Sequence, residues 1–264
     1  MVDPAAVNPK VRCRMETKGT SAPLLPRSAR TTRTKANYDR LACCYDAWAS
    51  WERPYVSAGF DMLAVQEGED YLEIGVGTGK LLARAGAASA SGACVGIDLS
   101  PRMCKRARRL CESELGESQV VAAVVDTVAE DPTRRVQVVC GDAFRLLREM
   151  VDARVMGFDA VAVCFTLELF DERDMNTLLG QVHRLISPRD NGRVVLVAMS
   201  KAAKGGCAMA CYRCIRACCP CVVDCKPIDV AGLVAGVDGL EVTQRSVLPM
   251  YGLAVELLEV RCVV

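Results

Sequence analysis

A glycine-rich turn between an apolar strand and a helix carries the strongest chemical signal in the sequence. The run Leu72-Glu-Ile-Gly-Val-Gly-Thr-Gly79 places glycines at positions 75, 77 and 79. Glycine permits positive φ and close approach of a ligand to the backbone, and such turns at the carboxyl end of a central strand bind nucleotides. A dinucleotide fingerprint would need glycine at position 80, where the chain has Lys80. The pattern favours a different nucleotide-type cofactor, with an ordinary tight turn as the alternative.

Two carboxylates follow later strands at positions suited to the same cofactor. Asp98 ends an apolar run and comes 23 residues after Gly75, which fits one helix and one strand. An acid there accepts hydrogen bonds from the two hydroxyls of a ribose. The alternative is a helix cap, because Ser100-Pro101 follows. Asp142 closes a third strand, where its carboxylate either accepts from an adenine amino group or belongs to an ordinary loop.

Short apolar runs alternate with helical patterns along the chain. Strands are expected near residues 71, 94, 137, 160 and 194, and helices over 78–88, over 101–116 and from Asp171 toward Pro188. Two further strand-like runs, 241–248 and 253–260, flank a turn signal. This alternation predicts an α/β fold, a doubly wound and mostly parallel sheet covered on both faces, with a C-terminal antiparallel hairpin.

The composition is that of a globular protein and excludes several function classes. The chain has 264 residues, of which 51% are hydrophobic and 25% charged, and its formal net charge is +1. This balance gives no general attraction for nucleic acid, and no apolar run is long enough for a transmembrane helix. The 16 cysteines indicate reduced thiols rather than a disulfide framework in a chain of this length. We expect a cytoplasmic protein, with a mitochondrial or other organelle matrix as the alternative.

Residues 1–36 differ from the rest of the chain. They hold eight lysines and arginines against only Asp3 and Glu16, four prolines, and few large apolar side chains. We therefore predict a disordered basic tail over 1–36, followed by a single domain over 37–264. A basic, acid-poor leader is also typical of an organelle transit peptide, although the prolines disfavour the amphipathic helix that such a peptide needs.

The motifs occur together, in the order and at the intervals of a known family. The segments 72–80, 96–100, 141–143, 158–160 and 184–188 closely resemble those of class I S-adenosylmethionine-dependent methyltransferases. The segment from Tyr38 to Asp46 looks like the entry helix of the branch around the ubiquinone and menaquinone C-methyltransferases, the type 11-like methyltransferases. The resemblance covers residues 37–264. It implies a Rossmann-like sheet of seven strands, S-adenosylmethionine as cofactor, and a small-molecule acceptor such as a quinol or phenol.

The resemblance also assigns cofactor-binding residues. The glycine turn would hold the methionine end, two acids would hold the ribose and the adenine, and residues after the fourth strand would lie beside the sulfur. By this resemblance the residues are Glu73, Gly75, Gly77 and Gly79 in the turn, Asp98 at the ribose, Leu99, Asp142 and Ala143 at the adenine, Phe165 and Thr166 at the sulfur, and Tyr38 and Tyr45 over the site.

Methyl transfer asks little of catalytic side chains, because a sulfonium methyl group is already an activated electrophile. The protein must align the acceptor and exclude water, and a phenol or ring-carbon acceptor also needs a general base. No catalytic residue is identified. Glu168 and Asp171 are weak candidates because they follow the fourth strand, whereas the single histidine, His183, is distant along the chain. The alternative is a catalytically silent member that binds the cofactor and acts through a partner.

Seven cysteines crowd into the segment 207–225. Several are spaced three and four residues apart, which places them on one face of a helix. We interpret them as apolar replacements on a substrate-side helix, because Asp224-Cys-Lys-Pro227 resembles the sequence that follows this helix in the family. The alternatives are lipidation with peripheral membrane contact, redox sensing, and the binding of a soft metal or an arsenical, which would make arsenite the methyl acceptor. No metal site is predicted: Cys211 and Cys214 have the spacing of a zinc knuckle, but the segment as a whole matches a structural zinc site poorly.

Overall fold

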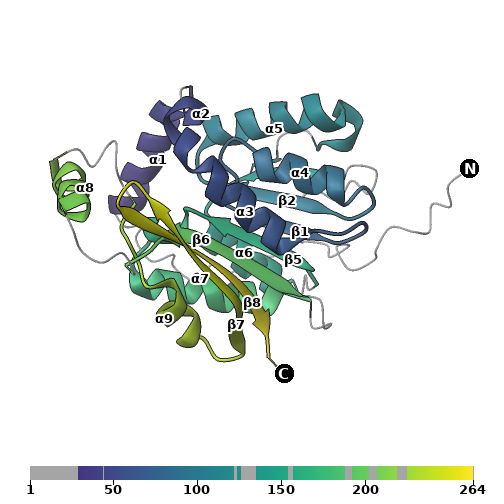
Figure 1. Ribbon diagram of the computed structural model, residues 1–264. Coiled ribbons are helices and arrows are strands. Elements are labelled where there is room, and N and C mark those ends of the chain that lie inside the picture. The colour runs from purple at the N-terminus through teal and green to yellow at the C-terminus, as the bar shows by residue number, and fades with distance from the viewer. Residues whose placement is uncertain are drawn as a thin grey trace, which may run out of the picture.

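The fold is an α/β sandwich around one mixed sheet, seen in a computed structural model (Figure 1). The structure describes residues 29–43, 45–121, 124–125, 135–153, 157–187, 192–201, 207–218 and 225–263. The sheet has the order β3-β4-β2-β1-β5-β6-β8-β7. Its strands are β1 (Tyr71–Ile74), β2 (Cys94–Asp98), β3 (Val124–Val125), β4 (Val136–Cys140), β5 (Ala160–Cys164), β6 (Arg193–Met199), β7 (Leu240–Met250) and β8 (Leu253–Cys262).

The first six strands run parallel, and β8 pairs antiparallel with both β6 and β7. All seven expected strands are present, and the additional β3 is a two-residue strand at the edge beside β4. When β3 is left out and the other strands are numbered by their order in the chain, they lie across the sheet in the order 3-2-1-4-5-7-6. This order confirms the predicted Rossmann-like sheet and its C-terminal hairpin. The strands of the sheet centre are buried at nearly every position, as helices on both faces require.

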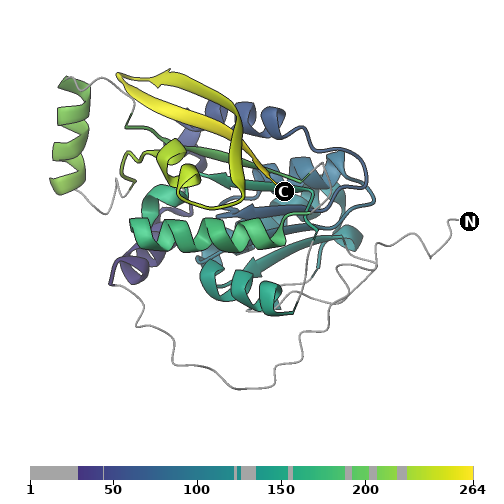
Figure 2. The same cartoon turned by 90° about the horizontal axis from the view of Figure 1, so that it is seen from below.

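Each face of the sheet packs against its own helices. Helices α3 (Arg53–Leu63), α4 (Lys80–Ala88) and α5 (Pro101–Leu115) bury apolar side chains against one face. Helices α6 (Ala143–Asp152), α7 (Glu172–Leu185) and α9 (Val230–Ala235) cover the other, as Figure 2 shows from below. The described segments also contain the short 3-10 turns η3 (Ala49–Trp51), η4 (Glu117–Gln119) and η5 (Leu167–Leu169).

Helix starts follow local chemistry. Ser100 caps α5, since its hydroxyl accepts a hydrogen bond from Met103 N at 3.2 Å, and Pro101 occupies the first turn. Asp171 occupies the cap position of α7, but its side chain accepts no capping bond there. No helix in the described segments is long and apolar enough to span a bilayer.

The N-terminal region begins earlier than the predicted domain boundary. Helix α1 (Ala29–Leu41) includes residues 29–36, which were expected in the tail, while residues 1–28 lie outside the described residues. Contacts with α5 hold this helix: Ser100 Oγ donates to Asp39 Oδ1 at 2.6 Å, and Arg102 Nη1 donates to Asp39 O at 3.1 Å. The short helix α2 (Tyr45–Trp48) follows. Tertiary contacts therefore compensate for the poor apolar content of this segment.

Candidate cofactor and acceptor site

The glycine turn lies between β1 and α4, at the carboxyl end of the parallel strands. Gly75, Gly77 and Gly79 all have positive φ, at 82°, 53° and 86°. A Cβ on Gly75 would lie 2.1 Å from Thr166 Oγ1, so this glycine lets the turn pack against the end of β5. A Cβ on Gly77 would meet nothing closer than 4.0 Å, which leaves open space above the backbone. The turn is therefore a backbone cradle at Gly77.

Gly79 has a different task from the other two. A Cβ there would lie 2.6 Å from Ala107 Cα in helix α5, and Gly79 does not line the cavity that its neighbours enclose. It permits close packing of α4 on α5, which is the usual role of the third glycine in turns of this type. The expectation that all three glycines contact the cofactor is thus not matched by the position of Gly79.

Asp98 is partly buried at the end of β2 and holds the turn in place. Its two carboxylate oxygens accept from Gly77 N at 2.9 Å and from Ser100 N at 2.8 Å. Burial raises the pKa of Asp98 to about 6, although these backbone bonds favour the ionised form. Since Ser100 itself caps α5, the alternative reading of Asp98 as the helix cap is not what the structure shows.

A cavity with about 870 Å³ of empty space opens above these strand ends. Apolar walls dominate it, and its polar groups come from the strand ends and from the N-terminal helices. Asp142 also caps α6 by accepting from Phe144 N at 3.0 Å. Ten of the twelve residues expected at the cofactor line the cavity, the exceptions being Glu73 and Gly79. These ten are Tyr38, Tyr45, Gly75, Gly77, Asp98, Leu99, Asp142, Ala143, Phe165 and Thr166.

Several lining residues were not foreseen. Leu169 and Phe170 belong to the turn after β5, and they could have been found from the rule that loops at the carboxyl ends of parallel strands form the site. Thr34 and Lys35 come from the segment expected to be disordered, so composition pointed away from them. Phe165 has a φ of 47°, a conformation rare for a residue with a side chain, and it is 5% exposed.

The N-terminal helices form a cover over the site. The rings of Tyr38 and Tyr45 lie 5.9 Å apart, and both line the cavity. Asp46 fixes this cover to the body, because it pairs with Lys80 Nζ at 2.6 Å and with Arg106 Nη2 at 2.6 Å. Burial opposes the ionisation of Asp46, but its hydrogen bonds from Lys80 and Thr78 outweigh it, and its pKa lies below the usual value.

A second cavity of about 560 Å³ of empty space adjoins the first. The two share wall residues, including Tyr45, Gly77 and Phe165. Glu73 lines the second cavity, is 4% exposed, and its Oε2 has no hydrogen-bond partner among the described residues. Burial raises its pKa well above the usual value. Glu52 lines the same cavity and was not predicted, because it directly precedes α3, away from the strand ends to which the sequence motifs point.

The two candidate catalytic acids lie elsewhere. Glu168 is fully buried, and its Oε1 accepts from Met199 N at 3.1 Å, which ties η5 to β6. Burial raises its pKa to about 8. The side chain of Asp171 is 62% exposed and lies 4.0 Å from Lys226 Nζ. Neither acid lines either cavity, and His183 packs against Gly239 on the side of α7 and β7.

The cysteine-bearing helix α8 (Cys207–Cys218) stands apart from the sheet, at the same side of the molecule as α1 (Figures 1 and 2). Cys211, Cys214 and Cys218 are exposed, so the interpretation of these thiols as packing replacements is wrong. Met209 and Tyr212 face the body instead, because residues three and four apart share one helix face and the thiols occupy another. Among the described residues, no three His, Cys, Asp or Glu side chains are arranged to hold a metal.

Comparisons with known proteins agree with this geometry. A family model described as a methyltransferase domain matches residues 72–194. A demethylmenaquinone methyltransferase from Tropheryma whipplei (strain Twist) is 36% identical over 94 residues, which are 31% of this chain and 36% of that protein. The match thus spans about a third of the relative's length.

Solved structures share the fold at low sequence identity. The N-methyltransferase NodS from Bradyrhizobium japonicum WM9, solved with S-adenosyl-L-homocysteine, has a TM-score of 0.57 at 15% identity over 87% of this chain and 98% of its own. The magnesium protoporphyrin IX methyltransferase from Synechocystis PCC 6803 has a TM-score of 0.51 at 12% identity, over 92% of this chain and 89% of its own. Residues 72–194 are thus similar to a methyltransferase domain, and the strand order is that of the fold shared with these solved methyltransferases.

Proposed function

We propose that the chain transfers a methyl group from S-adenosylmethionine to a small-molecule acceptor. The observation that supports this most strongly is the first cavity, where the cradle at Gly77, the carboxylate of Asp98 and that of Asp142 meet. The residues present fit the cofactor: the open space at Gly77 suits a ligand, and the partly buried carboxylates of Asp98 and Asp142 suit the hydroxyls and the amino group of an adenosine. The partly matching quinone-type relative and the varied acceptors of the structural neighbours support a small-molecule acceptor of unspecified type.

When bound, the cofactor supplies an activated methyl group. The chain's own residues then bind and orient the cofactor and the acceptor, and they exclude water. Asp98 would hold the ribose, Leu99 and Ala143 would enclose the adenine with Asp142, and the glycine turn with Glu73 would hold the methionine end. Phe165 and Thr166 would border the reacting centre, and Tyr38 with Tyr45 would keep water out, which strengthens catalysis by positioning.

The roles of Glu168 and Asp171 follow from their surroundings. The carboxyl of Glu168 joins η5 to the backbone of β6, so we assign it to positioning the turn after β5. Asp171 is exposed and lies outside both cavities, so we assign it no part in the reaction.

The test is the affinity for S-adenosylhomocysteine of Asp98→Ala, measured by titration calorimetry. Losing a charged hydrogen-bond acceptor should cost roughly 1.5–3 kcal/mol, or about 10- to 150-fold in affinity. Asp171→Ala, an exposed aspartate outside the cavities, is the matched control and should bind like the wild type. Unchanged affinity in a folded Asp98→Ala protein would contradict the ribose assignment.

Turnover separates the enzyme from the silent alternative. Cofactor consumption should be measured over quinols, phenols, amines, sterols and arsenite. Turnover of one acceptor class would support the proposal and name the acceptor. Tight cofactor binding with no turnover of any class would favour a binding protein that acts through a partner.

A further inference from the structure

Glu52 is a buried carboxyl in the wall of the second cavity, bonded to Tyr45, which lines both cavities, and the functions assigned so far do not use it. We propose that Glu52 is the catalytic base that accepts the proton of a hydroxyl acceptor, a phenol or quinol, and that Tyr45 positions it. This proposal rests on the proposed methyl transfer and deepens it by naming the acceptor class and the group that receives its proton.

Glu52 lies in the N-terminal segment, between η3 and α3. Glu52 directly precedes α3 and is 8% exposed, and Tyr45 Oη donates to its Oε2 at 3.2 Å. Its neighbour Trp51 packs edge-on against Phe165, with ring centroids 5.8 Å apart. Since Phe165 lines both cavities, this contact holds the carboxyl next to the turn at the end of β5, where the reacting centre is proposed.

No lysine or arginine in the described part of the chain compensates for the burial of Glu52. The basic groups of the second cavity are engaged elsewhere: Lys80 pairs with Asp46, and Arg53 Nη2 donates to Asp46 O at 2.8 Å. Among the described residues, Glu52 forms no ion pair with a lysine or arginine. A carboxyl buried for stability alone is normally paired, so this arrangement is typical of a functional group.

Apart from Lys80 and Arg53, which are engaged with Asp46, the titratable groups around Glu52 are acidic or neutral. They are Tyr38 from α1, Tyr45 from α2, Cys164 from β5, Glu168 from η5 and Tyr212 from α8, with Glu73 and Asp46 on the cavity wall. Burial raises the pKa of Glu52 to about 7, against the hydrogen bond from Tyr45. A base whose pKa lies near the working pH is the most effective in proton transfer.

The step balances without another reactant. The acceptor oxygen forms a bond to the methyl carbon as the sulfur–methyl bond breaks, and the electron pair of that bond stays on sulfur. The O–H bond of the acceptor breaks, and its proton passes to the Glu52 carboxylate. The proton then leaves to solvent when the products depart.

Glu52→Gln tests the role while keeping the shape, because the amide oxygen can still accept from Tyr45. We expect its affinity for S-adenosylhomocysteine to stay within about twofold of the wild type, whereas kcat for a phenol at pH 7 falls by roughly 10²- to 10⁴-fold. The rise of kcat with pH near 7 should also disappear. For a nitrophenol that is already ionised at this pH, the loss should be much smaller.

Tyr45→Phe is the companion variant, because it removes the hydroxyl that donates to Glu52 and keeps the ring. It should lower kcat less than Glu52→Gln and move the midpoint of the pH profile rather than abolish it. An equal loss of kcat for the phenol and the ionised nitrophenol would overturn the proposal, as would an unchanged kcat. A wild type that binds S-adenosylhomocysteine but methylates only amines or thiols would overturn the hydroxyl assignment and leave the proposed methyl transfer standing.

A measurement without turnover complements these. Infrared difference spectra of Glu52→Gln against the wild type should show a protonated carboxyl band that titrates with a midpoint near pH 7. Absence of that band would overturn the assignment of a protonatable Glu52 even if no acceptor had been found.

Discussion

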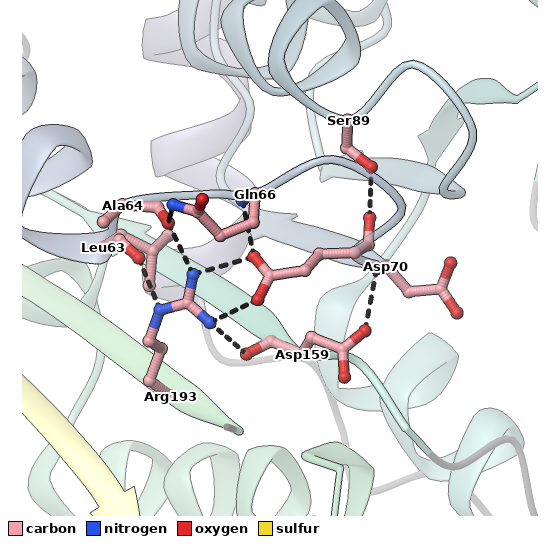
Figure 3. Close-up of polar contacts among 8 residues, drawn as sticks. Leu63, Ala64, Gln66, Asp70, Ser89, Asp159 and Arg193 are labelled. Atoms are coloured by element: carbon pink, nitrogen blue, oxygen red, sulfur yellow. Dashed lines mark hydrogen bonds and ion pairs between the residues drawn. The ribbon is translucent and has the colours of Figure 1, made fainter. Parts of the chain in front are cut away.

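Buried ionisable side chains differ between the two ends of the parallel strands: at one end they are paired with an opposite charge, and at the other no described cation pairs with them. At the amino end, the guanidinium of Arg193 is 7% exposed and fully paired (Figure 3). It forms a bidentate pair with Glu69, both N–O distances being 2.8 Å, and also donates to backbone carbonyls of Leu63, Ala64 and Asp159. At the carboxyl end, no described cation pairs with the buried carboxyls of Glu52 and Glu73.

The paired end contributes to stability, whereas the carboxyls at the other end are suited to function. A buried ion pair whose remaining donors are all satisfied recovers its desolvation cost and joins the segments before β1, β5 and β6. Burial raises the pKa of the carboxyls of Glu52 and Glu73, for which no described cation compensates. Such groups lower the stability of the empty protein, and they are suited to binding a ligand or a proton. The following variants test this contrast.

The largest effect is expected at the paired end. Arg193→Met should lower the free energy of unfolding by about 3–5 kcal/mol, because it leaves Glu69 and several carbonyls buried without their donor. Urea unfolding followed by circular dichroism measures this. The matched control is Arg261→Met, whose guanidinium is 44% exposed and lies 2.8 Å from Glu259, and which should cost less than about 1 kcal/mol. Similar decreases in the free energy of unfolding of both variants would show that the buried pair stabilises the protein no more than the exposed one.

Two glycines of the turn allow packing and binding to be compared, because Gly79 packs against α5 and Gly77 faces open space. Gly79→Ala should lower stability by at least about 1–3 kcal/mol, because strain at positive φ adds to a clash with α5. Gly77→Ala should cost only the strain, about 1–2 kcal/mol, but should weaken S-adenosylhomocysteine binding more strongly. Thermal unfolding and calorimetry give the two quantities. If Gly79→Ala lost affinity while keeping its stability, the packing role would be wrong.

Carboxyls whose pKa is raised by burial predict an unusual pH dependence of the stability of the ligand-free protein. The folded-state pKa values of Asp98, Glu52 and Glu168 are raised to about 6, 7 and 8, so their protonated forms favour folding. Their contribution is complete at low pH and is lost as pH rises through these values, so stability should decline from about pH 5 to about pH 8. Glu168→Gln, which keeps the bond from Met199, should reduce this decline by on the order of 1 kcal/mol. Urea unfolding across this pH range would reveal it, and a stability that increases with pH would contradict it.

The smallest effect concerns the segment before α1. Deleting residues 1–28 should leave the melting temperature and the affinity for S-adenosylhomocysteine nearly unchanged, because this stretch contains few large apolar side chains. Deleting 1–36 is the informative comparison. It also removes Thr34 and Lys35, which line the cavity, and should weaken binding. A drop in melting temperature for the shorter deletion would show that the tail packs on the domain.

The sheet and most of the cofactor cavity were predictable from the sequence, because their signals are local. Continuous apolar runs alternating with helical periodicity determine a parallel sheet. Once that sheet exists, the residues after each strand, Asp98 and Asp142 among them, must meet at one edge. The glycine spacing after β1 likewise specifies the turn by conformational demands that only glycine meets at little cost.

Only the tertiary structure decided which segments meet across long distances. The pairing of Asp39 and Asp46 with α4 and α5 made residues 29–36 helical, although their composition predicted a tail. The same cover brought Glu52 beside Phe165, and packing against Ala107 took Gly79 out of the cavity wall. Helix α8 turned Tyr212 inward and its thiols outward, which residue type alone could not predict. In each case the free energy comes from contacts between distant segments, and spacing along the chain carries no record of them.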